Sequence, residues 1–484
     1  MEPNFPELVA HCIRANELGD GQMFIAVNRG RFVLNRNSGE WLRWSGHHWE
    51  IDQDSAGALI AVEAVCAKYL DEARRLVDEI AETKDTQKLN ALCDYQKAIY
   101  KRVNKLRSDR GRKNCLQFAH TSEFGLAISG DKIDTDPWSL PCPNGVVNLK
   151  TGELENGVPE DFLVSACPTK WAGISTPCPI WERMLLECQD GKADMVGYLR
   201  RLFGYAITGL HSEHVLPVFW GQGRNGKGTI VETLKSVLGL GLAAPVQAEL
   251  LLDQAFMRSS AGPSPDIMAL KGVRLAFASE TDDGRRLSPA RVKWLTGGDT
   301  LKARNPHDRY ETSFVPSHTL FLLTNHKPHA PSDDFAFWER LHLIPFPISF
   351  VDRIPQAENE READKYLETK LRAEYPGILA WLVRGCIEWQ QDGLDPPAVV
   401  REATAGYRRD EDMLADFVDE CCIVDADERV TATALYNAFT TWFELNYGKR
   451  IPSQKRFGGL MAKKFERRKD GIFFYYGVTL PSGR

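Results

Sequence analysis

The first part of the chain alternates apolar and polar residues in short runs that are separated by turn-forming residues. The runs "RFVLNR" (31–36), "WLRWSG" (41–46) and "HHWEID" (47–52) follow this two-residue period. A two-residue period is typical of strands with one buried face, so we expect a small antiparallel meander. From 56 to 82 the apolar residues recur at steps of three and four, which predicts one long helix.

The middle of the chain changes its period twice. The segment "PCPNGVVNLKTGELENG" (141–157) holds an Asn-Gly and a Thr-Gly turn dipeptide on either side of a short apolar run, which predicts a hairpin. Residues from about 179 to 210 have helical spacing. Strand-like and helix-like runs then alternate up to about residue 350. This alternation predicts an α/β unit with a largely parallel sheet.

The last third of the chain begins with helical spacing over 361–391 and then a linker candidate, "DGLDPP" (392–397). A small basic unit follows over 410–484. Its runs "TATALYNAFTTWFELN", "SQKRFGGLMAKKFERRK" and "GIFFYYGVTL" predict a helix, a basic helix and a pair of strands. We therefore expect three domains, with the boundaries 1–185, 186–400 and 401–484.

Composition narrows the class of protein. The 484 residues are 43% hydrophobic and 26% charged, which fits a globular chain. No apolar run reaches a membrane-spanning length, and the start has no basic-then-apolar signal pattern, so we expect a bacterial host cytoplasm and no membrane partner. The 11 cysteines include no C-x-x-C pair, which disfavours a disulfide framework or a zinc ribbon.

Charge is distributed unevenly along the chain. The net charge of −6 does not by itself indicate a nucleic-acid binder. Two segments, Lys97–Lys113 and Lys449–Lys469, are nevertheless strongly basic. Such runs are either solvated helix faces or nucleic-acid contacts, and for the first of them the sequence leaves both interpretations open.

The stretch "GQGRNGKGTI" (221–230) lies between the apolar run "VLPVFW" and the helical run "TIVETLKSVL". A glycine loop between a buried strand and a helix start presents backbone N–H groups and a favourable dipole to phosphate. A plain glycine turn is the alternative. The spacing G-x-x-x-x-G-K matches the Walker A pattern, in which the lysine reaches the β- and γ-phosphates. The nucleotide-binding residues that we expect are Gly221, Gly223, Asn225, Gly226, Lys227, Gly228 and Thr229.

Two details of this loop make specific predictions. Gly221, Gly223 and Gly226 are expected to allow positive φ angles and the close approach of phosphate. Gly228 stands where the pattern usually has Ser or Thr, and the hydroxyl comes one place later, in Thr229. Thr229 is therefore the candidate hydroxyl ligand of magnesium.

Polar side chains also end the next two strand candidates. "VRLAFAS" (273–279) leads into Glu280, and "HTLFLLTN" ends at Asn325. A carboxylate beside the phosphate loop can hold magnesium or polarise the attacking water, and an amide can orient that water. We therefore expect Lys227, Glu280 and Asn325 to form one site, with Thr229 and Glu280 on the metal.

The order of these motifs resembles that of the superfamily III helicases, and most closely the helicase half of the phage and plasmid primase-helicases, relatives of the poxvirus primase-helicase. "GQGRNGKGT" matches motif A, "PSPDIMALKGVRLAFASE" leads into motif B, "KWLTGGDTLKAR" matches motif B′ and "LFLLTNHKP" matches motif C. "FWERLHLIPF" resembles the segment that carries the arginine finger, here Arg340. "GEWLRWSGHHWEID" and "NGVVNLKTGEL" resemble the domain before the ATPase, so the resemblance covers nearly the whole chain.

The resemblance implies an α/β fold with a P-loop AAA+-like ATPase core, an α+β N-terminal domain and a C-terminal winged-helix-like domain. It implies ATP and Mg²⁺ as cofactors and a hexameric ring that moves 3′ to 5′ on single-stranded DNA. The implied catalytic residues are Lys227 for phosphate, Glu280 as the Walker B acid, Asn325 as the sensor and Arg340 as a finger in the neighbour's site. Priming is not expected, because no acid cluster or zinc site for primer synthesis is visible.

DNA contacts are expected on two elements. The B′ segment of the family supplies a hairpin that reaches into the pore of the ring, and a basic hairpin grips a phosphate backbone without reading sequence. The basic helix near the C-terminus resembles the recognition helix of a duplex-binding winged helix. A plain surface hairpin and a protein-docking winged helix are the alternatives. The candidates are Lys302, Arg304, His307 and Arg309 on the hairpin, and Lys455, Arg456, Lys463 and Lys464 on the helix.

The function that we expect is an ATP-dependent DNA helicase for replication of a phage, plasmid or integrated element, working with a separate primase or replication initiator. An origin-binding or helicase-loading ATPase switch without processive unwinding is the alternative. Nucleotide kinases also contain G-K-G-T, but they are much shorter and lack the B′ block. RNA-directed relatives fit less well, because the C-terminal unit resembles a duplex binder.

Overall fold

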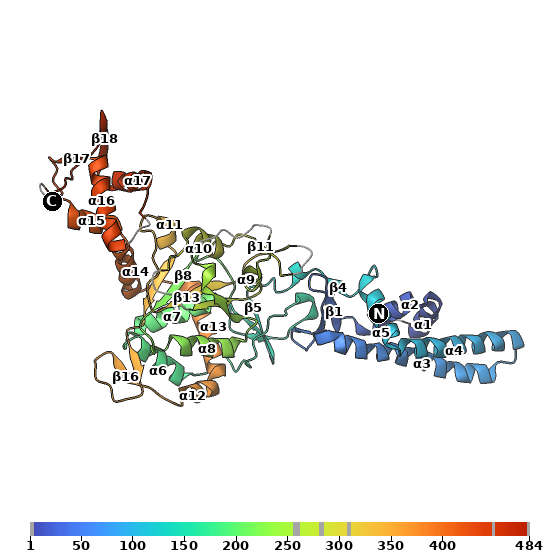
Figure 1. The fold of residues 1–484 in the computed structure, drawn as a ribbon. Coiled ribbons are helices and arrows are strands. Elements are labelled where there is room, and N and C mark those ends of the chain that lie inside the picture. Colours follow the sequence, from blue (N-terminus) through green and yellow to red (C-terminus); the bar gives the residue numbers. More distant parts are fainter. Residues whose placement is uncertain (1–3, 255–261, 280–284, 307–310, 448–450, 482–484) are drawn as a thin grey trace.

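The computed structural model describes residues 4–254, 262–279, 285–306, 311–447 and 451–481. Figure 1 shows an elongated molecule with a helical N-terminal part at one end, a sheet-containing body in the middle and a small C-terminal unit at the other end. None of the helices in these ranges combines the length and the apolar character needed to cross a membrane.

The N-terminal part combines five helices with a small sheet in the order β3-β2-β1-β4. The predicted meander is confirmed, because β1 pairs antiparallel with β2 and β2 with β3. The predicted long helix is also confirmed over Ala56–Glu82. The elements are α1 (Phe5–Ala15), α2 (Glu17–Asn28), β1 (Phe32–Asn35), β2 (Trp41–Trp44), β3 (Trp49–Ile51), α3 (Ala56–Glu82), α4 (Thr86–Leu106), α5 (Asp109–Thr121) and β4 (Ala127–Ile128).

The basic run over 97–113 lies on α4 and α5, and most of its cations meet acids of the same N-terminal part. Arg102 is buried and pairs with Asp20, which also accepts a hydrogen bond from the Tyr69 hydroxyl at 3.1 Å. Further ion pairs join Lys97 to Asp94, Lys105 to Glu17, Arg107 and Arg112 to Glu63, and Lys113 to Asp109. These partners favour a structural role for the run over a nucleic-acid contact.

The predicted hairpin over 141–157 is confirmed and has a third strand. β5 (Ser139–Cys142) pairs antiparallel with β6 (Gly145–Asn148), which pairs antiparallel with β7 (Leu154–Glu155). This small sheet leads into α6 (Pro179–Cys188) and α7 (Ala193–Ala206). These two helices confirm the helical spacing predicted over about 179–210, and Gly191 turns the chain between them with φ 76°.

The central sheet is parallel throughout and has the order β14-β8-β13-β10-β9. Its strands are β8 (Leu216–Trp220), β9 (Ala243–Gln247), β10 (Leu275–Ser279), β13 (Thr319–Thr324) and β14 (Leu341–Pro345). The mixed α/β fold with a parallel sheet is therefore confirmed. Strands β8, β10 and β13 are buried almost completely, which is why they appear as continuous apolar runs in the sequence.

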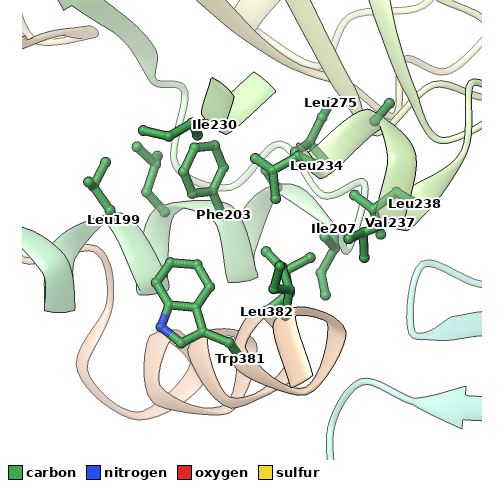
Figure 2. Close-up of a cluster of buried hydrophobic side chains, with 14 of the residues drawn as sticks. Leu199, Phe203, Ile207, Ile230, Leu234, Val237, Leu238, Leu275, Trp381 and Leu382 are labelled. Carbon is green, nitrogen blue, oxygen red and sulfur yellow. The ribbon is translucent and has the colours of Figure 1, made fainter. Parts of the chain in front are cut away.

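Helices cover both faces of this sheet. On one face, α7, α8 (Lys227–Leu238) and α13 (Tyr375–Asp392) form the largest hydrophobic core, and Figure 2 shows Phe203, Leu234 and Trp381 pointing into it. The other core includes buried residues of α10 (Pro289–Thr296), α11 (Phe335–Trp338) and α14 (Ala398–Asp410). The remaining elements of the body are α9 (Pro265–Met268), α10 (Pro289–Thr296), β11 (Leu301–Ala303), β12 (Thr312–Phe314), α11 (Phe335–Trp338), β15 (Ser349–Val351), β16 (Glu360–Glu362) and α12 (Leu367–Ala373).

The prediction that helices resume at Arg361 is wrong in its first residues. Arg361 lies in β16, which pairs in parallel with β15, and the helix α12 begins only at Leu367. The guanidinium of Arg361 donates to Asp190 at 3.0 Å in the connection between α6 and α7. Pairing with β15 and a long-range ion pair therefore override the local helical spacing at this point.

The C-terminal unit has the order helix, strand, helix, helix, strand, strand. Phe439 and Phe457 stack with ring centroids 4.6 Å apart in the core of the unit. The elements are α14 (Ala398–Asp410), which leads into the unit, and then α15 (Met413–Cys421), β17 (Arg429–Thr431), α16 (Ala432–Tyr447), α17 (Gln454–Lys464), β18 (Glu466–Asp470) and β19 (Ile472–Tyr476).

The predicted first helix of this unit is confirmed as α16. The predicted basic helix over 453–469 ends at Lys464, and its last residues form the strand β18, which pairs with β19. The strand pair therefore does not lie within 471–480 as predicted, because Gly471, with φ 67°, turns the chain between the two strands. The helix α15 and the strand β17 were not predicted.

Two buried histidines of the body predict sensitivity to acid. His211 and His318 lie edge to face with centroids 5.5 Å apart, and burial lowers the pKa of His211 to about 4 and that of His318 to about 3. Both imidazoles are therefore neutral in the folded protein at pH values where an unfolded histidine binds a proton. Their contribution to stability is complete above about pH 6.5 and is lost as the pH falls toward 4.

We expect the free energy of unfolding, measured by urea titration, to fall between pH 6.5 and pH 5 by up to about 1.4 kcal/mol per pH unit for each imidazole. His318→Gln removes one of the imidazoles whose pKa burial lowers and should therefore show a shallower acid slope. Equal slopes for the variant and the wild type would contradict this assignment.

Candidate nucleotide-binding site and nucleic-acid interface

The glycine loop connects the end of β8 to the start of α8. Gly226 is the residue before the helix and has φ 85°, and a Cβ placed there would lie 2.4 Å from the Cys188 sulfur. A Cβ on Gly221 would lie 2.4 Å from the Phe346 carbonyl oxygen. Both positions therefore require glycine, because neighbouring segments approach the loop too closely for any side chain.

The expected positive φ angle at Gly223 is not observed. A Cβ on Gly223 or Gly228 would meet nothing within 4 Å, and Gly223 is not among the residues with positive φ. The left-handed residue in the middle of the loop is Arg224, with φ 62°. Its carbonyl oxygen accepts a hydrogen bond from Phe350 N–H at 2.7 Å, and this contact helps to hold the unusual conformation.

Lys227 and Asn325 meet at the carboxyl edge of the sheet. The strands before them, β8 and β13, are neighbours in parallel register, so both strand ends lie on the same edge. The Lys227 ammonium is 7% exposed and donates to the Gly221 carbonyl at 2.5 Å and to the Asn325 amide oxygen at 3.2 Å. Burial lowers the pKa of Lys227 to about 8. Both partners are neutral oxygens, so an arriving anion would find a cation with no acid bonded to it among the described residues.

Other groups at this helix start also suit an anion. Asn225 is 3% exposed, and its amide nitrogen has no hydrogen-bond partner among the described residues. The N-terminus of α8 contributes unpaired backbone N–H groups and a positive dipole end. The structure thus brings a buried ammonium, an unpartnered amide and a helix N-terminus together, and a phosphate would satisfy all three.

One of the two expected magnesium ligands, Thr229, lies within the described residues. Thr229 lies half-buried in the first turn of α8, while Glu280 lies outside the described residues. Ser279, the residue before it, ends β10 beside Leu323 of β13. No group of three or more His, Cys, Asp or Glu side chains gathers as a metal site in the described ranges. This donor set fits Mg²⁺ held mainly by phosphate oxygens, which needs only one or two protein ligands.

The loop is held from outside by a segment that sequence reasoning did not connect with it. Arg224 Nη1 pairs with Asp352 at 3.0 Å, and Phe350 lies against Gly226. These residues belong to β15 and the turn after it, more than 120 positions from the loop. No local pattern in the sequence signals such a contact.

Arg340 lies at the amino end of the strands, opposite the carboxyl end where Lys227 and Asn325 meet. It directly precedes β14, which pairs in parallel with β8 from Leu341–Leu216 to Pro345–Trp220. Five paired residues separate the two ends of these strands by roughly 16 Å. The guanidinium donates to the Ala336 carbonyl at 2.6 Å, and its Nε has no partner among the described residues. Arg340 therefore lies at the amino end of the strands, across the sheet from the glycine loop.

The predicted basic hairpin lies in the body. β11 and β12 pair antiparallel, with Lys302 opposite Ser313 and exposed. Arg304 follows β11 and is half-buried, with its carbonyl oxygen accepting from Ser264 N–H at 3.0 Å. His307 and Arg309 lie outside the described residues. The structure thus shows the base of a hairpin with at least one outward-facing cation.

The basic helix α17 has the amphipathic arrangement expected from its sequence. Ser453 caps it by accepting from Arg456 N–H at 3.4 Å, and Phe457 and Met461 are buried in the core of the unit. The four predicted contact residues Lys455, Arg456, Lys463 and Lys464 are all exposed. Two of them already have acidic partners, because Lys463 lies 3.4 Å from Asp333 and Lys464 lies 2.8 Å from Asp412.

The adjoining strands carry cations that were not proposed as contacts from the sequence. Arg467 stacks on Phe473 with the guanidinium 3.9 Å from the ring centroid, and Arg468 lies 5.1 Å from the Tyr476 ring. Arg429 lies 4.6 Å from the Phe474 ring. The charged run "ERRKD" faces the aromatic run "IFFYY" across the hairpin. This juxtaposition in the sequence could have indicated these cation–ring pairs.

Comparison with known proteins gives three findings. Residues 21–190 match the family model described as "D5 N terminal like". The chain is 28% identical over 454 residues to "Putative helicase L207/L206" of Acanthamoeba polyphaga mimivirus, covering 89% of this chain and 46% of that protein. It is 26% identical over 448 residues to "Putative helicase 022R" of Frog virus 3 (isolate Goorha), covering 78% and 44%. The chain therefore spans about half the length of the curated relatives that it matches.

A solved structure, the apo C-terminal region of NrS-1, aligns with 70% of this chain and 72% of its own at 14% identity and a TM-score of 0.41. The family model and the viral relatives support the part of the resemblance that concerns D5-like helicases.

Proposed function

We propose that this chain is the motor part of an ATP-dependent DNA helicase of the superfamily III type, built on a P-loop AAA+-like core. The observation that carries the proposal is the meeting of Lys227 and Asn325 beside a glycine loop, with Arg340 on the opposite edge of the neighbouring strand. A P-loop lysine bonded to a polar residue at the end of the adjacent strand is the arrangement that a γ-phosphate sensor needs.

Each residue of the site has a separate proposed role in ATP hydrolysis. Lys227 exchanges the Gly221 and Asn325 oxygens for the β- and γ-phosphate oxygens of ATP. Asn325, released from the ammonium, then orients the attacking water. Thr229 and Glu280 would hold Mg²⁺, which neutralises charge on the phosphates when bound. Arg340 serves the site of a neighbouring subunit in a ring, proposed to be a hexamer, because its own phosphate loop lies across the sheet.

DNA is proposed to bind at two places. The β11–β12 hairpin, with Lys302 and Arg304, tracks the backbone of a single strand in the pore during 3′-to-5′ movement. The C-terminal unit, whose order of helices and strands supports a winged-helix assignment, holds duplex DNA on α17. A phage, plasmid or integrated element that replicates with a separate primase or initiator is the setting that fits these parts.

The test is a strand-displacement assay with matched duplexes that carry either a 3′ or a 5′ single-stranded tail. With ATP and magnesium, we expect the 3′-tailed duplex to be unwound, while the 5′-tailed and blunt duplexes stay paired. The Lys227→Ala protein provides the control for ATP dependence. Unwinding of the 5′-tailed duplex alone would overturn the polarity. ATP hydrolysis that does not depend on single-stranded DNA, together with no unwinding of any duplex, would instead favour a loading or origin-binding switch.

A further inference from the structure

An open groove of about 430 Å³ lies between the basic helix α17 and the loop that precedes α11. Three cations of the C-terminal unit line it, namely Lys455, Arg456 and Lys463. The acid among its described lining residues is Asp333, and that residue comes from the sheet-containing body. Two parts of the chain that are more than 100 residues apart therefore line the same groove. The C-terminal unit contributes its cations, and the body contributes Asp333.

The contact across the groove is weak. Lys463 Nζ lies 3.4 Å from Asp333 Oδ2, with side chains that are 63% and 38% exposed, and exposed ion pairs contribute little to stability. A phosphate group that enters the groove would meet three cations and would compete with Asp333 for one of them. Charge-assisted bonds to phosphate are stronger than an exposed, long ion pair, so the exchange favours the phosphate.

The lining also indicates which nucleic acid fits. None of the described lining residues is aromatic, so the groove offers no ring on which an unpaired base could stack. Single strands are held largely by such stacking, whereas a duplex presents its phosphates on the outside. The groove therefore matches the backbone of duplex DNA better than a single strand.

The loop that carries Asp333 leads directly to Arg340. The next residue, Asp334, caps α11 through Phe337 N–H at 3.1 Å and pairs with Lys293 of α10 at 2.8 Å. Arg340 follows α11 after one further residue. The loop at Asp333 is thus joined to the proposed finger by a single turn of helix.

The same loop is tied to α14 and, through it, back to α17. The Tyr407 hydroxyl donates to the Pro328 carbonyl, and Ala330 N–H donates to Glu411 at 2.9 Å. Arg408 Nε donates to the Ser332 carbonyl at 3.0 Å. Asp412, just beyond, pairs with Lys464 of α17. The segment between Asn325 and Arg340 therefore contacts the C-terminal unit and its connecting helix along much of its length.

We propose that this groove binds the backbone of duplex DNA in exchange for the Lys463–Asp333 contact, so that Asp333 links DNA occupancy to the segment that carries Arg340. The inference rests on the proposed function and deepens it, because it assigns a regulatory role to the body at the DNA site. In the DNA-free protein, the Asp333 carboxylate is paired with Lys463, which is one of the three cations that line the groove. When a duplex displaces it, the loop before α11 is released from α17.

The test compares Asp333→Asn with Glu358→Gln, a matched variant that makes the same change in net charge at an exposed position between β15 and β16. Binding is measured by fluorescence anisotropy with a blunt duplex and with a single strand of equal length. We expect Asp333→Asn to bind the duplex about two- to fivefold more tightly than the wild type. Glu358→Gln should bind like the wild type.

A second measurement is the ratio of ATP turnover with duplex to turnover without it. This ratio should move toward one in Asp333→Asn, because DNA no longer releases a contact there. In a double-mutant cycle, Lys463→Gln should weaken duplex binding and remove the effect of Asp333→Asn. Equal duplex affinities for Asp333→Asn and Glu358→Gln would overturn the inference, as would a gain in single-strand affinity in Asp333→Asn as large as its gain in duplex affinity. Absence of ATP turnover in the wild type would count against the proposed function, while the binding arm would still test the groove.

Discussion

The Lys227→Ala protein is expected to lose ATP binding and to hydrolyse ATP at least about 100-fold more slowly than the wild type. The ammonium that it removes lies at the centre of the glycine loop and has only neutral oxygens as partners. No other described cation contacts these same oxygens, so nothing nearby replaces its charge. Nucleotide binding measured by calorimetry and turnover measured by phosphate release would both report the loss.

The same substitution should not destabilise the fold. Burial lowers the pKa of Lys227, which means that the folded protein bears a cost for holding this charge away from water. Removing it should leave the thermal midpoint unchanged or raise it slightly, as is common when a residue is retained for function. Lys235→Ala, on the same helix but paired with Glu232 at 2.8 Å, is the matched control and should retain ATP hydrolysis. Wild-type turnover in Lys227→Ala would end the assignment of the loop.

Arg340→Ala is expected to bind ATP normally and to hydrolyse it about a thousandfold more slowly. Arginine suits the role of a finger because it stays charged and its planar fork matches phosphate oxygens. The described residues give its guanidinium a backbone carbonyl as partner rather than a carboxylate, which weakens the alternative of a surface ion pair. Arg372→Ala, which removes an exposed arginine paired with Glu368, is the control and should be active.

Mixing separates a finger from a residue that supports its own site. Lys227→Ala subunits retain Arg340 but cannot use nucleotide, so adding them to Arg340→Ala subunits should restore part of the activity. As a control, the size of the assemblies that each variant forms is measured by light scattering and must be the same for both. Mixed assemblies that form normally but stay inactive would remove the support for action between subunits, and normal turnover of Arg340→Ala alone would refute it.

The parts of the site that the sequence predicts are those in which strands impose the geometry. Lys227 and Asn325 each follow an apolar strand, and parallel strands bring their carboxyl ends to one edge. The loop itself is less predictable, because Arg224 rather than Gly223 takes the positive φ. That choice depends on Phe350 and Asp352, which reach the loop only through the tertiary fold.

The basic segments show the same division between local and long-range causes. The amphipathic pattern places Phe457 inside and Lys455 outside without any knowledge of the fold. Whether a surface cation is available depends on partners elsewhere, as the buried Arg102–Asp20 pair and the Lys464–Asp412 pair show. A count of charges along the chain cannot distinguish these situations.

The position of Arg340 across the sheet from Lys227 has a genetic consequence for the proposed ring. Each active site would draw its loop from one chain and its finger from the next, so a site works only when both contributors are intact. If a chain carrying both Lys227→Ala and Arg340→Ala made up half of the pool, random assembly would leave roughly a quarter of the sites complete. Such an allele would therefore be dominant over the wild type, because the fraction of complete sites falls as the square of the fraction of normal chains.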